Sequence, residues 1–291
     1  MEILVTEPSK DYELIDSGEG EKIERYGNFV LSRPDPQAIW PKRLPKKIWD
    51  SAHGVFLGSE KTRPGWKLSS KMPERWPIEM GELKFWVRPS PFKHTGVFPE
   101  QSENWRWVSE IIKNSGHTPA VLNLFGYTGG ATLASLLLGA SVVHVDSSKV
   151  AITWAKDNVE LSGFSEKPVR WILEDTLSFV RREVRRGNKY DGIILDPPAF
   201  GRGAKGEIWK IEKNLPELLE LCFELLPGAP LFFLLNGYAS GYSAISYKNN
   251  LFPLTARYGG EISFGELSIR ESGDDCRLLP AGIFARWSSS I

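Results

Sequence analysis

Cysteine is nearly absent from this sequence, with two residues in 291, and histidine is scarce, with four. Two cysteines cannot build the disulfide network that stabilises small secreted domains. The histidines are scattered without the spacing of metal ligands, so no metal site is expected. The sequence also has no run of eighteen apolar residues, which argues against a membrane-spanning helix. Its first residues lack the basic and apolar segments of a secretion signal, and these absences together predict a cytoplasmic protein.

A net charge is missing as well, because 36 lysines and arginines balance 36 aspartates and glutamates. A strong general attraction to nucleic acid is therefore not implied. The charges are unevenly distributed, with an acidic stretch over residues 1–25 and a basic stretch over residues 33–88. The basic stretch is either an ordinary solvated surface or a surface that faces a polyanion, and the sequence leaves both open.

Residues 1–90 are predicted to form a small β-rich domain, and residues 91–291 a larger one. Strand-like alternation at Tyr12–Asp16 and Phe29–Arg33, with glycines between, supports the first assignment. Five of the tryptophans fall in this region, where core packing is a better explanation for each than base stacking. The small domain is a possible substrate-binding or RNA-binding module.

Strands and helices alternate regularly after residue 120, which predicts a parallel, doubly wound sheet of the α/β class. The expected strands are 121–125, 141–146, 169–174, 190–196 and 231–235. Two further strands, 261–269 and 282–287, complete a predicted seven-stranded, mostly parallel Rossmann-like sheet.

The first of these strands ends at Gly126, and the next helix begins near Gly129 or Gly130. A strand that ends in a glycine turn at a helix start is a common nucleotide-binding geometry, because the glycines let the backbone approach a ligand. The turn alone could serve NAD, a phosphate group or no ligand.

Three aspartates follow the next three strands. Asp146 lies twenty residues after Gly126, where a carboxylate accepts hydrogen bonds from ribose hydroxyls. Asp175, with Thr176 beside it, is placed to contact an adenine edge, and Asp196 ends the fourth strand. Any one of them could be only a helix N-cap. Three in successive register after a glycine turn favour a nucleoside site.

The segments Asn123-Leu-Phe-Gly-Tyr-Thr-Gly-Gly, Asp146-Ser-Ser, Glu174-Asp-Thr and Asp196-Pro-Pro-Ala-Phe resemble the motifs of class I S-adenosylmethionine-dependent methyltransferases. The branch resembled has an Asp-Pro-Pro motif and includes large-subunit ribosomal RNA methyltransferases. The resemblance spans about residues 92–287. It implies S-adenosylmethionine rather than NAD as cofactor, and a methyltransferase sheet.

The resemblance also implies a set of site residues. Thr95, Phe98 and Gln101 would lie over the methionine end of the cofactor, and Asn158 would support the site from a helix. The full set of implied cofactor-binding residues is Thr95, Phe98, Gln101, Asn123, Phe125, Gly126, Tyr127, Thr128, Asp146, Ser147, Asn158, Asp175, Thr176 and Asp196.

Methyl transfer from a sulfonium is an in-line displacement, so alignment and desolvation supply most of the catalysis. The candidate catalytic residues are Asp196, Pro197, Pro198 and Phe200. The prolines would stiffen the loop, Asp196 would accept a hydrogen bond from an amino group or base edge, and Phe200 would stack on a flat target. A base in a duplex would first have to be flipped out. Arg202 and Lys205 in the next loop are possible phosphate contacts.

Methylation of cytosine at carbon 5 normally requires a cysteine thiolate that adds to the ring. Relatives with that activity carry a cysteine after the fifth strand, where this chain has Asn236 and Tyr238 but no cysteine. Cys222 falls at a core position of a helix, and Cys276 follows two aspartates that would raise the pKa of its thiol. A covalent cysteine mechanism is therefore not expected, and Asn236 and Tyr238 become candidate substrate contacts.

The favoured hypothesis is an S-adenosylmethionine-dependent methyltransferase that acts on an RNA base, with ribosomal RNA foremost. A methyltransferase for a protein or a small molecule is the alternative within the enzyme class. A degenerate cofactor-binding module that regulates is a third hypothesis, against which the intact Asp196 motif argues. No membrane or metal partner is expected, and the sequence does not specify an oligomeric state.

Overall fold

The computed structural model describes residues 1–59, 62–91, 93–203, 206–238, 241–273 and 277–289. They form two compact units, one of Met1–Leu4, Glu103–Leu267 and Gly282–Ile291, the other of Val5–Ser102 and Ser268–Ala281. The long segment of the first unit begins at Glu103, and the turn that precedes it belongs with the N-terminal strands of the second unit. Thr6 Oγ1, for example, donates a hydrogen bond to the carbonyl of Pro99 at 3.2 Å.

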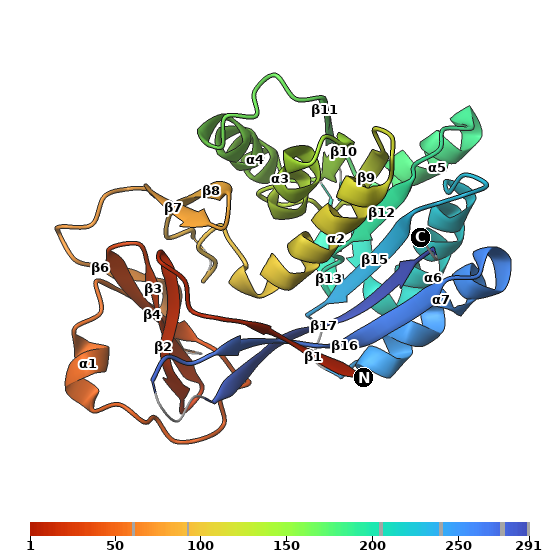
Figure 1. Ribbon diagram of the computed structural model, residues 1–291. Coiled ribbons are helices and arrows are strands. Elements are labelled where there is room, and N and C mark those ends of the chain that lie inside the picture. The colour runs from red at the N-terminus through yellow and green to blue at the C-terminus, as the bar shows by residue number, and fades with distance from the viewer. Residues whose placement is uncertain (60–61, 92, 204–205, 239–240, 274–276, 290–291) are drawn as a thin grey trace. The chain divides into compact units, whose positions relative to one another are not determined.

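The first unit contains a large mixed sheet with helices on both faces (Figure 1). Its eight strands lie in the order β1-β16-β17-β15-β12-β9-β10-β11. Strands β9 to β12 and β15 run parallel, and β17 is antiparallel to β15. The strands are β1 (Glu2–Thr6), β9 (Ala120–Leu124), β10 (Ser141–Asp146), β11 (Val169–Leu173), β12 (Gly192–Leu195), β15 (Phe232–Gly237), β16 (Glu261–Arg270) and β17 (Leu278–Ser288).

This architecture confirms the predicted doubly wound, mostly parallel fold. Seven of the eight strands are those expected from the sequence, and β1 is an addition at the sheet edge. The central strands β12 and β15 are buried along their whole length, as near-continuous apolar strands of parallel sheets are. The carboxyl ends of the parallel strands meet at one edge of the sheet, where open α/β sheets bind ligands.

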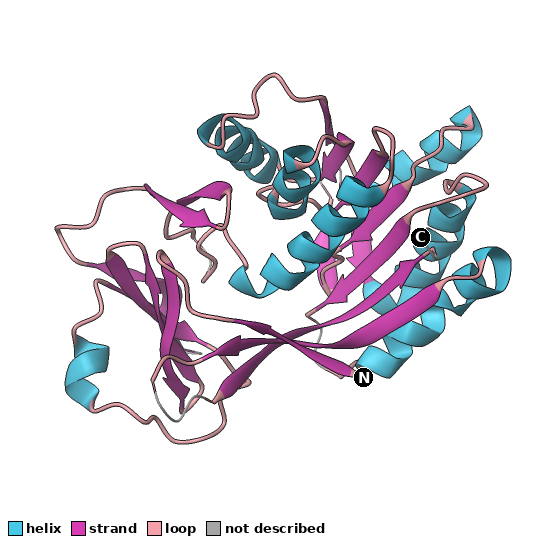
Figure 2. Ribbon diagram, viewed as in Figure 1, coloured by secondary structure: helices cyan, strands magenta, loops and turns pink. Residues whose placement is uncertain are grey.

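Figure 2 shows α2 on one side of this sheet and α6 and α7 on the other. The helices of the unit are α2 (Ser102–Asn114), α3 (Gly130–Leu137), α4 (Lys149–Leu161), α5 (Thr176–Arg186), α6 (Ile211–Glu224) and α7 (Ala244–Tyr258). Helix α7 was not expected from the sequence, because Pro253 lies within it and its exposed positions are polar or mixed. Its buried residues Tyr247, Leu251 and Leu254 recur at helical spacing and dock it on the core.

The second unit is rich in strands, as expected for the N-terminal region. It contains a five-stranded sheet in the order β2-β3-β4-β5-β6 and a separate hairpin, β7-β8. Burial alone would raise the pKa of Glu24, but the nearby Arg33 and Lys22 cations hold it at about 2. Its elements are β2 (Tyr12–Gly18), β3 (Glu21–Tyr26), β4 (Phe29–Pro34), α1 (Lys46–Asp50), β5 (Gly54–Ser59), β6 (Thr62–Leu68), β7 (Trp76–Met80), β8 (Leu83–Val87) and the 3-10 turn η1 (Pro99–Gln101).

The structure was searched for membrane-spanning helices and for clusters of metal ligands. None of the helices in the described part of the chain has the length and apolarity that a membrane span requires. In that same part of the chain, no cluster of histidine, cysteine, aspartate or glutamate is arranged to hold a metal ion.

Candidate active site

The loop between β9 and α3 has an unusual backbone. Phe125 and Tyr127 adopt φ angles of 58° and 47°, in the left-handed region that residues other than glycine rarely enter, and Gly129 has a φ of 89°. The amide of Gly126 donates to the carbonyl of Val145 at 3.0 Å, which ties the loop to the neighbouring strand β10. Backbone strain of this kind persists only where surrounding contacts enforce it, and it gathers at functional sites.

Two glycines of this loop are required by packing against the protein itself. A Cβ atom on Gly126 would lie 2.5 Å from the imidazole of His144, and one on Gly130 would lie 2.3 Å from the indole of Trp105. Packing against His144 and Trp105 therefore requires these glycines, and approach of the loop backbone to a ligand stays a prediction.

Replacement of Gly126 by alanine should destabilise the fold by about 1–3 kcal/mol, because the new methyl group overlaps a fully buried ring. Urea unfolding of the full chain measures this change. Gly228→Ala is the matched control, since a Cβ at Gly228 meets nothing within 4 Å. Equal free energies of unfolding for the two variants would contradict the packing account.

His144 packs against the loop at Gly126 and belongs to a buried network of polar side chains. It lies between Asn123 of β9 and Trp171 of β11 in the sheet register. Thr132 Oγ1 accepts from Asn123 Nδ2 at 2.9 Å and lies 2.9 Å from His144 Nδ1. The hydroxyl accepts from Asn123 and can either donate to Nδ1 or accept from it, so this contact fits either tautomer of a neutral ring. Burial lowers the pKa of His144 from 6.5 to about 3.

This neutral histidine makes stability depend on pH. Its folded pKa lies below the unfolded one, so between pH 6.5 and 3 the unfolded chain binds more protons and stability falls as pH falls. His144→Gln should remove that contribution, about 1.4 kcal/mol per pH unit well inside the window. Urea unfolding at pH 6.5 and pH 5 tests it, since all other groups titrate alike in both proteins. Parallel pH profiles would show that His144 is not held neutral.

Asp146, at the end of β10, binds the loop and has capacity for a ligand. Its Oδ2 accepts from the amide of Tyr127 at 2.9 Å, and its Oδ1 accepts from the amide of Ser148 at 2.8 Å. Burial raises the pKa of Asp146, while these amide donors oppose the rise. Three backbone amides use part of the four acceptor positions of the carboxylate, and the remaining capacity can serve a ribose hydroxyl. The amide of Ser147 also bonds this carboxylate and opposes the rise of its pKa.

Three further predicted cofactor residues of this unit lie on helices, Asn158 on α4 and the pair Asp175 and Thr176 at the start of α5. Asn158 Nδ2 donates to the carbonyl of Thr128 at 2.9 Å, so this buried helix residue does hold the loop. Asp175 accepts from the amide of Ser178 at 2.9 Å and caps α5, which is the structural role considered for it from the sequence. Thr176 is buried in the first turn of α5. Contact of Asp175 and Thr176 with an adenine edge stays a prediction.

The segment Asp196–Phe200 follows β12 and is fixed by Trp209. The indole nitrogen of Trp209 donates to the carbonyl of Pro198 at 2.7 Å, and its ring centroid lies 5.0 Å from that of Phe125. Trp209 thereby joins the Asp-Pro-Pro loop to the glycine loop. Trp209 lies in a short hairpin that nothing in the neighbouring sequence indicates.

That hairpin consists of β13 (Phe200–Arg202) and β14 (Ile208–Lys210). Trp209 is buried on its inner face, whereas Phe200 and Ile208 are 53% and 55% exposed. The ring of Phe200 is therefore largely exposed, and its stacking on a flat target stays a prediction. Arg202 lies in β13, and Lys205 lies outside the described residues.

Leu195 of β12 and Leu235 of β15 are partners in the sheet register. Asp196 directly follows the first and Asn236 the second, so the two residues lie on neighbouring strands at the carboxyl edge of the sheet. Adjacent strands are about 4.8 Å apart. Asn104 of α2, which is not among the predicted site residues, donates through Nδ2 to Asn236 Oδ1 at 2.8 Å. That bond occupies the amide oxygen and leaves the Asn236 nitrogen as the group that can serve a substrate. Tyr238 follows at 38% exposure.

Thr95, Phe98 and Gln101 belong to the second unit. Thr95 and Gln101 are buried there, and the ring of Phe98 lies 5.4 Å from that of His94. Burial lowers the pKa of His94 to about 4, in keeping with a structural histidine. The position of these three residues over the cofactor stays a prediction.

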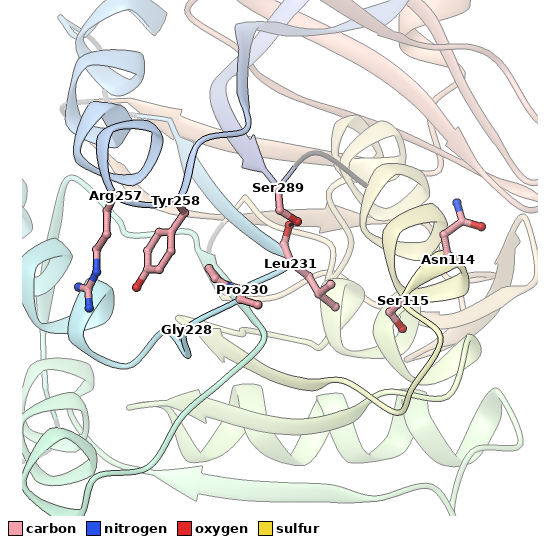
Figure 3. A pocket seen from close by; sticks show the side chains of 9 residues that line it. Asn114, Ser115, Gly228, Pro230, Leu231, Arg257, Tyr258 and Ser289 are labelled. Carbon is pink, nitrogen blue, oxygen red and sulfur yellow. Dashed lines mark hydrogen bonds between the residues drawn. The ribbon is translucent and has the colours of Figure 1, made fainter.

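A cavity of about 500 Å³ lies at the opposite edge of the first unit, before β15 begins (Figure 3). It is lined by Asn114, Ser115, Gly228, Ala229, Pro230, Leu231, Arg257, Tyr258 and Ser289. None of these is a predicted site residue, and the strained loop and the aspartates are at the other ends of the strands. This cavity is therefore separate from the candidate active site.

Comparison with known proteins identifies the family. The model of the S-adenosylmethionine-dependent methyltransferase family matches residues 48–251. The chain belongs to this family. Membership confirms the resemblance and, with it, S-adenosylmethionine as the cofactor class rather than NAD. The residues present fit this cofactor, because the Asp146 carboxylate can accept hydrogen bonds and lies beside the strained loop. Its hydrogen bond to the amide of Tyr127 helps to hold that loop in one conformation.

Three relatives of this methyltransferase illustrate the similarity. The crystal structure of an S-adenosylmethionine-dependent methyltransferase from Agrobacterium tumefaciens is 40% identical, with a TM-score of 0.94 over 100% of this chain and 94% of that one. The ribosomal RNA large subunit methyltransferase K/L of Chromohalobacter salexigens is 27% identical, over 89% of this chain and 35% of that protein. The ribosomal RNA large subunit methyltransferase K of Neisseria meningitidis is 29% identical, over 77% and 64%. The chain thus spans only part of these two curated relatives.

Proposed function

We propose that this methyltransferase transfers a methyl group from S-adenosylmethionine to a nitrogen of an RNA base, with ribosomal RNA as the first substrate to test. The observation that carries the proposal is the pairing of Asp196 with Asn236 at adjacent strand ends, next to the exposed ring of Phe200. A carboxylate, an amide nitrogen and a flat ring together match a nucleobase better than an aliphatic metabolite.

The cofactor, when bound, supplies an electrophilic methyl group on a sulfonium. Asp146 and the Phe125–Gly129 loop would hold it, with Asn158 keeping the loop in place. Asp196 would accept a hydrogen bond from an N–H of the base, which fixes the base and can take up a proton at its carboxylate. Phe200 would stack on the base and limit its rotation. Alignment of two reactants is the main requirement of such a displacement.

Transfer to nitrogen is supported by the state of the cysteines. Cys222 is fully buried, and burial raises the pKa of its thiol far above the neutral range. It lies near the end of α6, where the carbonyl of Leu225 accepts from the amide of Tyr190 before β12 begins, so the thiol is at the opposite edge of the sheet from Asp196. Cys276 lies outside the described residues. A thiolate nucleophile for carbon methylation is thus missing from the described part of the candidate active site.

Support for RNA comes from aromatic groups and relatives more than from charge. Phe200, Tyr238 and Tyr242 are all between 38% and 53% exposed. Several cations of the basic N-terminal stretch are instead paired with carboxylates, including Lys42 with Glu21 and Lys46 with Asp50. This pairing favours the solvated-surface interpretation of that stretch. RNA contacts by the second unit remain part of the proposal.

Incubation with methyl-labelled S-adenosylmethionine tests the proposal. The substrates are RNA, protein and small-molecule fractions from cells that lack this protein, each supplied separately. Label in the RNA fraction, with binding that weakens linearly in log salt, is the expected result. Label in the protein or small-molecule fraction alone would overturn the choice of RNA.

A further inference from the structure

Tyr247 combines a buried side chain with a hydroxyl that has no partner. The residue is 1% exposed, and its Oη atom makes no hydrogen bond to any described residue. Buried phenol groups usually find a partner, because an unsatisfied hydroxyl costs stability. Phenylalanine would fill the same space without that cost, so the hydroxyl needs an explanation outside the resting structure.

The hydroxyl lies at the carboxyl edge of the sheet. Helix α7 places it directly against Gly237, the last residue of β15, where an added Cβ would lie 2.2 Å from Oη. Gly237 follows Asn236, one of the two polar groups that meet at the ends of β12 and β15. Burial, and secondly the charge of Asp196, raise the pKa of Tyr247 to about 12. The hydroxyl is therefore protonated at neutral pH and can act as a donor.

We propose that the Tyr247 hydroxyl is a substrate-binding group, which donates a hydrogen bond to an acceptor atom of the base held beside Asp196. This inference rests on the proposed function and adds a specificity requirement to it. Asp196 accepts from an N–H, whereas Tyr247 requires a carbonyl oxygen or an unprotonated ring nitrogen. The target base must then present a donor and an acceptor on neighbouring atoms.

Tyr247→Phe in the full chain is the test, because it removes one oxygen and leaves the ring. With hypomodified ribosomal RNA as the probe, kcat/KM should fall about 10- to 100-fold, since an acceptor of the base loses its partner. Affinity for S-adenosylmethionine should not change. The melting temperature without RNA should stay the same or rise, because an unsatisfied group has been removed.

Tyr190→Phe is the matched control, because the Tyr190 hydroxyl donates to Glu183 Oε2 at 2.7 Å. It should show the reverse pattern, a lower melting temperature with unchanged kcat/KM. Wild-type transfer to RNA with an unaltered kcat/KM for Tyr247→Phe would overturn the Tyr247 assignment alone. A lower melting temperature for Tyr247→Phe would also overturn it, since it would reveal a structural hydrogen bond. Failure of the wild-type protein to methylate RNA would overturn the proposed function as well.

Discussion

Asp146→Ala is expected to weaken S-adenosylmethionine binding by at least about 100-fold. The substitution removes the two oxygens that the ribose hydroxyls would reach, and hydrogen bonds to a charged group contribute about 1.5–3 kcal/mol each. It also releases the amides of Tyr127 and Ser148, so the strained loop loses its anchor. Isothermal titration calorimetry of the full chain with S-adenosylmethionine measures the effect.

Asp191→Ala controls for the loss of a carboxylate that binds backbone. Asp191 accepts from the amide of Ala120 at 2.8 Å, at the opposite edge of the same sheet. This variant should lose stability but keep wild-type cofactor affinity. If Asp146→Ala also binds the cofactor as the wild type does, the assignment of Asp146 to the ribose is wrong.

Asp196→Ala should leave cofactor affinity within about threefold of wild type and reduce the rate of methyl transfer about 100- to 1,000-fold. In the proposed site the carboxylate accepts a hydrogen bond from the base that receives the methyl group, and positioned acid–base groups contribute rate factors of this size. Single-turnover transfer to RNA at saturating cofactor isolates the chemical step from binding. Nearly unchanged cofactor affinity with slow methyl transfer would distinguish the role of Asp196 from that of Asp146, whose loss should weaken cofactor binding.

The Asp191→Ala variant serves again as the control for stability. Its transfer rate should match the wild type, because Asp191 lies at the far edge of the sheet. Full transfer activity of Asp196→Ala would move the reaction centre away from the Asp-Pro-Pro loop.

The sheet could be predicted from the sequence because its strands are apolar and because α4 and α5 begin at ordinary side-chain N-caps. The five parallel strands begin or end within a few residues of their expected bounds. The strand-end aspartates were also readable, since a carboxylate after each strand is a local signal. The roles of these aspartates could be predicted only in part, because Asp175 caps a helix, as any aspartate at such a position can.

The missed features depend on contacts between residues far apart in the chain. Nothing near Trp209 in the sequence shows that its indole will meet Pro198 and Phe125. The sequence around His144 is that of an ordinary strand and does not show that the ring packs against Gly126. Tyr247 lay in a polar segment interrupted by a proline, where a helix was not expected. Such residues are defined by the assembled fold and not by a motif.

The central claim is that this methyltransferase modifies a nitrogen of an RNA base at Asp196. Nucleoside mass spectrometry of hypomodified ribosomal RNA, after reaction with S-adenosylmethionine and either wild type or Asp196→Ala, tests it most directly. We expect wild type, but not the variant, to produce one additional N-methylated nucleoside. The appearance of 5-methylcytidine, or equal products from both proteins, would contradict it.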